Sequence, residues 1–164
     1  MRVPIRKPGK YTHDQPDLNV TENKFQELCD KLKKLQASQP AAAAEVRRTA
    51  EMGDLSENAG YQIAKGRLRG INEKILQLQD QINRAKIIQP GNTGTVNLGA
   101  TVTVEIAGKQ KDFLILGSSE TDPARGIISH LSPIGQALLG KRAGETARVK
   151  LKDREVAYKI IAIR

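Results

Sequence analysis

The sequence predicts an α+β protein in which a long antiparallel helical hairpin, a coiled coil, precedes a smaller domain built on an antiparallel β-sheet. Apolar residues recur at alternating three- and four-residue steps over residues 58–88, which predicts one helix of a coiled coil. After Pro90-Gly91-Asn92 the pattern changes to short β-branched segments that are typical of strands. Aromatic residues make up only 3% of the chain. That scarcity favours thin helical packing beside a small second domain over one thick core.

The chain begins with an arm, residues 1–20, that we expect to be irregular because Pro4, Pro8, Gly9 and Pro16 interrupt it. The hairpin should span residues 21–89. Its first helix should start near Asn19, whose side chain would cap it. The apolar seam of this helix continues beyond Pro40, which a helix tolerates at a kink. The seam residues are Phe25, Leu28, Leu32, Leu35, Ala43, Val46 and Ala50.

The second helix carries the clearest pattern in the chain. Its seam should consist of Tyr61, Ala64, Leu68, Ile71, Ile75, Leu78, Ile82 and Ala85. So narrow a stripe needs one partner helix along its whole length. Gly53 should end the first helix, and the short connection that follows makes the two helices antiparallel neighbours. Gly60, Gly66 and Gly70 disfavour this helix by about 1 kcal/mol each relative to alanine, which hints that packing is not the only constraint there.

Two acidic residues, Asp54 and Glu57, lie at the predicted tip, residues 53–58. Their spacing fits a capping box in which Asp54 caps the second helix and Glu57 reaches back to it. The same spacing lets two carboxylates project from an exposed apex, and Mg²⁺ binds oxygen ligands of this kind. Two carboxylates alone hold Mg²⁺ poorly, so a metal at this tip would have to be shared with a partner. Local sequence leaves both interpretations open.

Residues 53–75, GDLSENAGYQIAKGRLRGINEKI, resemble the tip and second helix of the bacterial Gre transcript-cleavage factors, GreA and GreB. A second stretch, GIISHLSPIGQALLGKRAGE at residues 126–145, resembles the C-terminal signature of the same family. Two motifs in the family's order make the resemblance specific, although Gly60 and Leu131 stand where the family often has acidic or polar residues. The family tip pattern is matched by Gly53, Asp54, Glu57, Asn58, Ala59 and Tyr61.

The resemblance implies a function for the tip. The hairpin would enter the secondary channel of a backtracked RNA polymerase, where Asp54 and Glu57 help to hold a catalytic Mg²⁺ and orient the water that cuts the nascent RNA near its 3′ end. Gly53, Ser56, Asn58 and Tyr61 would support the tip. The protein would then bind no cofactor stably, because Mg²⁺ is shared with the polymerase, and it would not be an enzyme by itself. The alternatives are a channel inhibitor without cleavage activity and an adaptor whose hairpin binds another protein.

Basic residues crowd the helices behind the tip, opposed over residues 65–74 only by Glu73. We interpret them as a phosphate-binding patch for the RNA, although a solvated helix face would have the same composition. This stretch resembles GreB more than the sparser GreA. The residues are Arg47, Arg48, Lys65, Arg67, Arg69 and Lys74.

Residues 90–164 should form the second domain, and the resemblance implies an FKBP-like fold that docks on the polymerase. Strands are expected at 100–106, 112–116, 126–131, 146–151 and 156–163, with a short helix at 133–139 that Gly140 ends. Ser132, Pro133 and Ile134 are the candidate docking loop, with an ordinary turn into a helix as the alternative. Prolyl isomerase activity is disfavoured because this half has only Phe113 and Tyr158 to line an aromatic pocket.

The charge and the remaining composition narrow the class of protein. A formal net charge of +9 predicts attraction to polyanions, although a solvated basic surface would give the same balance. The single Cys29 excludes an internal disulfide, and its helical neighbours suggest a small buried side chain. No apolar run is long enough for a membrane span, and the first residues lack the apolar segment of a signal peptide. We therefore expect a cytoplasmic monomer without membrane contact.

Overall fold

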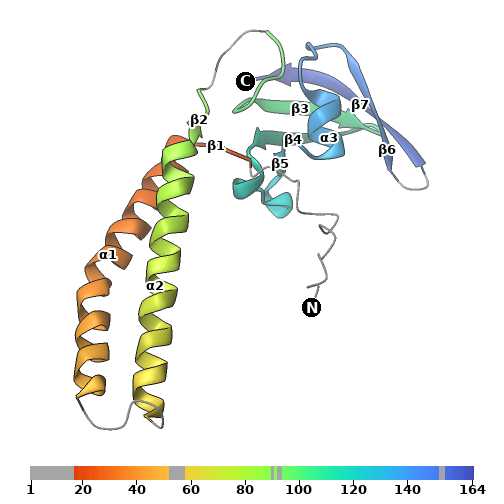
Figure 1. The fold of residues 1–164 in the computed structure, drawn as a ribbon. Coiled ribbons are helices and arrows are strands. Elements are labelled where there is room, and N and C mark those ends of the chain that lie inside the picture. The colour runs from red at the N-terminus through yellow and green to blue at the C-terminus, as the bar shows by residue number, and fades with distance from the viewer. Residues whose placement is uncertain (1–16, 52–57, 90, 92–93, 152–153) are drawn as a thin grey trace, which may run out of the picture.

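The computed structural model describes residues 17–51, 58–89, 91, 94–151 and 154–164. Two long helices form a rod that projects from a compact sheet domain (Figure 1). Helix α1 (Glu22–Ala50) runs through Pro40 without interruption, and α2 (Ala59–Arg84) returns beside it. The α+β class and the antiparallel hairpin predicted from the heptad pattern are therefore confirmed.

The predicted seam lies between the two helices. Every seam residue of α2 is buried or half-buried, and Ala64 and Ile75 are buried most deeply. In α1 the buried residue is Ala42, next to the predicted Ala43, whereas residues 36–41 are exposed. Gln39 there donates a 2.8 Å hydrogen bond to the side-chain oxygen of Asn72. The middle of the hairpin is thus joined by a polar contact where the apolar seam is interrupted.

The ends of the hairpin differ from the prediction. Thr21, not Asn19, caps α1, and its hydroxyl accepts from the Lys24 amide at 3.2 Å. Asn19 instead belongs to strand β1 (Asn19–Val20), which pairs in parallel with β2 (Lys86–Ile87). Helix α2 therefore stops at Arg84 rather than near residue 88, because the chain turns extended at Ala85 and pairs with β1.

The second domain is a five-stranded sheet in the order β5-β4-β3-β7-β6. Its strands are β3 (Thr101–Ile106), β4 (Lys109–Leu116), β5 (Ile127–Ser129), β6 (Thr146–Leu151) and β7 (Arg154–Ile163). The prediction of a purely antiparallel sheet was wrong at one edge, because β5 pairs with β4 in parallel. That pairing is possible because the chain crosses over through two 3₁₀ turns, η1 (Ser118–Glu120) and η2 (Pro123–Arg125), before β5 begins.

The main apolar core belongs to this sheet and to helix α3 (Pro133–Leu138). Val102 and Val104 of β3, Ile115 of β4, Ile160 of β7 and Leu138 of α3 are all fully buried. Alternate residues of β3 face the core, as the period-two pattern of the sequence requires. The sheet domain is consequently a firm base from which the hairpin extends.

Candidate functional site

The candidate site begins at the end of the hairpin furthest from the sheet. The carboxyl end of α1 and the amino end of α2 meet there (Figure 1). Gly53, Asp54, Ser56 and Glu57 belong to the connection between these ends and lie outside the described residues. The roles predicted for them therefore stay predictions, and the neighbouring residues supply the geometry.

Asn58 closes this end of the hairpin by bonding to both helices. Its side-chain oxygen accepts from the Tyr61 amide at 3.0 Å and so caps α2, while its side-chain nitrogen donates to the Thr49 carbonyl of α1 at 2.8 Å. The interpretation in which Asp54 caps the second helix was wrong, because α2 begins at Ala59 and its cap is Asn58. A Cβ on Gly60 would lie 3.2 Å from that Asn58 oxygen, so the glycine leaves room for the cap.

Tyr61 and Lys65 follow on the first two turns of α2. The tyrosine is half-buried against the seam, and the Lys65 ammonium lies 5.7 Å from the centre of its ring. A cation over a ring at this distance is an attractive cation–π contact. It holds one positive charge close behind the tip.

The six predicted basic residues are all exposed, but they do not form one stripe. At about 100° per residue, Lys65 and Arg69 share one flank of α2, whereas Arg67 and Lys74 share a flank roughly opposite. Arg67 confirms this placement because it bonds across the hairpin to Glu45 of α1, with the nitrogen and oxygen 3.3 Å apart. The hairpin thus presents positive charge on two sides.

Arg67 and Arg69 form ion pairs with acidic neighbours but stay accessible to solvent. Arg69 pairs with Glu73 one turn on at 2.9 Å, yet its side chain is 80% exposed. The Arg67 side chain is 68% exposed in its pair with Glu45. Ion pairs this exposed contribute about 1 kcal/mol or less, so an incoming phosphate can compete for either guanidinium.

A groove of about 490 Å³ between the helices extends the basic surface toward the sheet. Lys31, Lys34 and Lys74 line it above a floor of Leu35 and Leu78. The sequence analysis missed Lys31 and Lys34, although their three-residue spacing beside the seam was a usable signal. Hydrogen bonds from Lys31 and Lys24 hold the pKa of the nearby Glu27 at about 2, so this carboxylate stays ionised.

The predicted docking loop is a hydrogen-bonded turn into α3. Ser132 caps α3 by accepting from the Gly135 amide at 3.0 Å, and its hydroxyl donates to the Ser129 carbonyl at 2.6 Å. A Cβ on Gly135 would overlap the same carbonyl, so only glycine fits there. Ile134 packs against the core, which leaves Leu131, 52% exposed, as the large apolar side chain that this loop presents.

Two family models cover nearly all of the described chain. The model described as "Transcription elongation factor, N-terminal" matches residues 18–87, and "Transcription elongation factor, GreA/GreB, C-term" matches residues 91–164. The chain belongs to the GreA/GreB family of transcription elongation factors.

Individual Gre relatives align along most of the chain. It is 33% identical over 150 residues to the transcription elongation factor GreA of Treponema pallidum, covering 89% of each chain. It is 37% identical over 150 residues to GreA of Mycoplasma capricolum, covering 88% of this chain and 94% of that protein. The crystal structure of GreA factor homolog 1 of Thermus thermophilus matches at 24% identity and a TM-score of 0.42, covering 90% of this chain and 99% of that one.

Among the residues that the structure describes, no three histidine, cysteine, aspartate or glutamate side chains gather in a way that could hold a metal ion. None of the helices in the same residues is long and apolar enough to cross a membrane.

Proposed function

We propose that this Gre factor enters the secondary channel of RNA polymerase and stimulates Mg²⁺-dependent cleavage of backtracked nascent RNA. The observation that carries the proposal is the hairpin itself. With 26 residues in α2, it is a rod of roughly 40 Å, given a rise of about 1.5 Å per residue. At the far end of the rod, Asn58 bonds to both helices. Exposed cations lie along both helices behind this end.

The two tip carboxylates would act on the polymerase active site. In the sequence, Asp54 and Glu57 lie between Glu51, which caps the end of α1, and Asn58, which caps the start of α2. Carboxylate oxygens are the donors that Mg²⁺ prefers, but two of them leave most of its octahedron to water, phosphate or a partner. We therefore assign both residues to a shared ion, which would neutralise phosphate charge and activate water when bound. The protein is then an activator in trans and not a nuclease.

The basic flanks would guide the RNA. Arg47, Arg48, Lys65 and Arg69 offer exposed cations that contact phosphates without reading sequence, as a factor acting on any transcript needs. The sheet domain would dock on the polymerase outside the channel through Ser132 and Pro133, with Leu131 as the apolar contact. In this proposal the factor acts as a cytoplasmic monomer, with the polymerase and the RNA 3′ end as its partners.

The test is cleavage by a stalled polymerase. Bacterial RNA polymerase is backtracked on a template, the factor is added with Mg²⁺, and short 3′ RNA fragments are quantified. Asp54→Asn and Glu57→Gln should each slow cleavage by about 100-fold, equivalent to roughly 3 kcal/mol of lost charge stabilisation. Binding to the polymerase should persist because neither change alters the helices.

Glu51→Gln is the matched control, since it removes one carboxylate at the same end of the hairpin. Cleavage should survive this change if Asp54 and Glu57 have a specific role. Polymerase binding without cleavage by the unaltered protein would identify a channel inhibitor. Binding lost in both tip variants would favour the adaptor, and fragments released without polymerase would contradict action in trans.

A further inference from the structure

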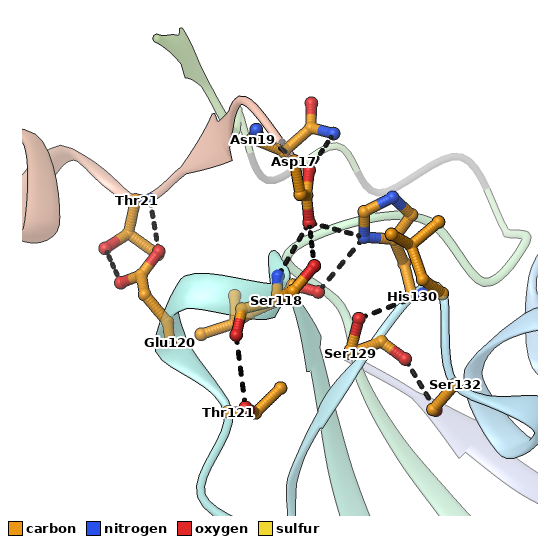
Figure 2. Close-up of polar contacts among 11 residues, drawn as sticks. Asp17, Asn19, Thr21, Ser118, Glu120, Thr121, Ser129, His130 and Ser132 are labelled. Carbon is orange, nitrogen blue, oxygen red and sulfur yellow. Dashed lines mark hydrogen bonds and ion pairs between the residues drawn. The ribbon is translucent and has the colours of Figure 1, made fainter. Parts of the chain in front are cut away.

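The hairpin and the sheet domain are joined by a small set of polar contacts on the segment that precedes α1. Residues 17–21 lie against η1 and the start of the loop after β5 (Figure 2). We call Asp17, Thr21, Ser118, Glu120 and His130 the clasp. None of these residues is among the sites predicted from the sequence.

The side chain of Asp17 is enclosed in the clasp, with 5% of it exposed. One carboxylate oxygen accepts from the Ser118 amide at 2.6 Å and from the Ser118 hydroxyl at 2.7 Å. The other accepts from the Asn19 amide at 3.1 Å and from the Asn19 side chain at 2.9 Å. Burial alone would raise the pKa of Asp17, but the hydrogen bonds from Ser118 and Asn19 outweigh it and lower the pKa. The carboxylate is therefore held as an anion with its acceptor sites filled.

His130 closes the other side of Asp17. Its Nδ1 lies 3.4 Å from the Asp17 carboxylate and 3.3 Å from the Leu116 carbonyl. Both neighbours are acceptors, so Nδ1 carries the hydrogen in this arrangement. The residue thereby connects the arm to the loop that leads into α3.

Glu120 makes the second connection, directly to the start of α1. Its carboxylate accepts from the Thr21 amide at 2.7 Å and from the Thr21 hydroxyl at 2.5 Å. The same hydroxyl accepts from the Lys24 amide as the cap of α1. A charged side chain of the sheet domain thus orients the cap of the first helix, 99 residues away in the sequence.

The second helix is tied to the same place through the backbone. The Lys86 amide donates to the Leu18 carbonyl at 2.7 Å, and the Ile88 amide donates to the Val20 carbonyl at 2.8 Å. On the other side of this short strand, Gly117 passes so close that a Cβ would overlap the Asn19 carbonyl. Both helices of the hairpin are therefore fixed relative to one segment, and the clasp fixes that segment relative to the sheet.

We propose that Asp17 and Glu120 are positioning residues that set the direction in which the hairpin leaves the sheet domain. The hairpin converts a small rotation at its base into a larger displacement at its far end, because the 26 residues of α2 make a rod of roughly 40 Å. If the sheet domain docks on the polymerase, the clasp aims the tip at the active site. This last step rests on the proposed function, whereas the fixed direction does not.

The direct test is the distance between the two parts, measured by double electron–electron resonance. Cys29 is first replaced by serine, and spin labels are placed on the exposed positions 44 in α1 and 109 at the β3–β4 turn, through Ala44→Cys and Lys109→Cys. The unaltered clasp should give a narrow distance distribution. Asp17→Ala and Glu120→Ala should each broaden or shift it, while circular dichroism shows that the helices and the sheet remain folded.

Two further variants separate positioning from folding. Among the described residues, Asp112 bonds to Thr103 and Arg164, both in the sheet domain, so Asp112→Ala should leave the distribution narrow. Glu120→Gln keeps an oxygen that can accept from Thr21 and should restore much of the narrow distribution. An unchanged distribution in both alanine variants would overturn the proposal.

The cleavage assay then separates this proposal from the proposed function. The two alanine variants should lose at least about tenfold in cleavage with the tip intact, because a misplacement of about 1 Å in catalytic groups can cost about 100-fold. Full cleavage despite a broadened distribution would refute the aiming role. If the unaltered protein stimulates no cleavage, the proposed function fails, while the distances still decide whether the clasp fixes the hairpin.

Discussion

Asn58 shows how one side chain can define the working end of the hairpin. The family resemblance selects this residue, but its structural role follows from two hydrogen bonds that join α2 to the last turn of α1. Local sequence favoured Asp54 as the cap because Asp-x-x-Glu is a common helix start. The Asn58 side chain caps α2 as an acceptor and at the same time donates to α1. A carboxylate has no donor for the second bond.

The two bonds of Asn58 can be separated by substitution. Asn58→Ala should lower the free energy of unfolding of the hairpin by about 1–2 kcal/mol, because it removes a helix cap and leaves the Thr49 carbonyl without this donor. Asn58→Asp retains a good cap but loses the donor, so its cost should be smaller. Urea unfolding followed by circular dichroism measures both, and equal losses would show that the cap contributes little.

At the scale of elements, the sequence predicted the seam of the hairpin well and its ends poorly. The heptad positions depend only on spacing, and every predicted seam residue of α2 is at least half-buried. The ends depend on partners far along the chain. Thr21 caps α1 while Glu120 holds it, and α2 stops where β2 pairs with β1. No local sequence pattern predicts that Glu120 bonds to Thr21 or that β1 pairs with β2. For this reason Asn19 was wrongly predicted to cap α1.

The glycines inside α2 test whether packing demands them. A Cβ at Gly66 would meet nothing within 4 Å, whereas one at Gly60 would crowd the Asn58 oxygen. Gly66→Ala should therefore raise the free energy of unfolding of the hairpin by about 1 kcal/mol, since alanine restricts the unfolded chain and favours helix. Gly60→Ala is the matched control and should gain less. Thermal unfolding of both variants provides the comparison, and no gain at Gly66 would mean that α2 is strained there.

At the scale of the whole molecule, each part could be predicted from the sequence but their connection could not. The strands and the helix of the sheet domain lie close to their predicted positions. The parallel pairing of β5 with β4 was not predicted. The relation between hairpin and sheet depends on the clasp, whose residues come from three separate stretches of the chain. Such contacts leave no periodic trace in a sequence.

The distribution of burial predicts that the two parts open separately. The sheet domain contains the large apolar cluster, with Val102, Val104 and Ile160 fully buried, whereas the buried residues of the hairpin helices are Ala42, Ala64 and Ile75. At about 25 cal/mol per Å² of buried apolar surface, the sheet should have the higher local stability. Native-state hydrogen exchange should therefore show α1 and α2 exchanging through an opening of lower free energy than β3 and β7.

The Gly66→Ala variant tests whether the hairpin and the sheet open separately. If the hairpin is a separate cooperative unit, alanine at position 66 should slow exchange throughout α1 and α2 and leave the amides of β3 and β7 unchanged. Uniform slowing across the whole molecule would instead mean that the clasp couples the two parts into one unit.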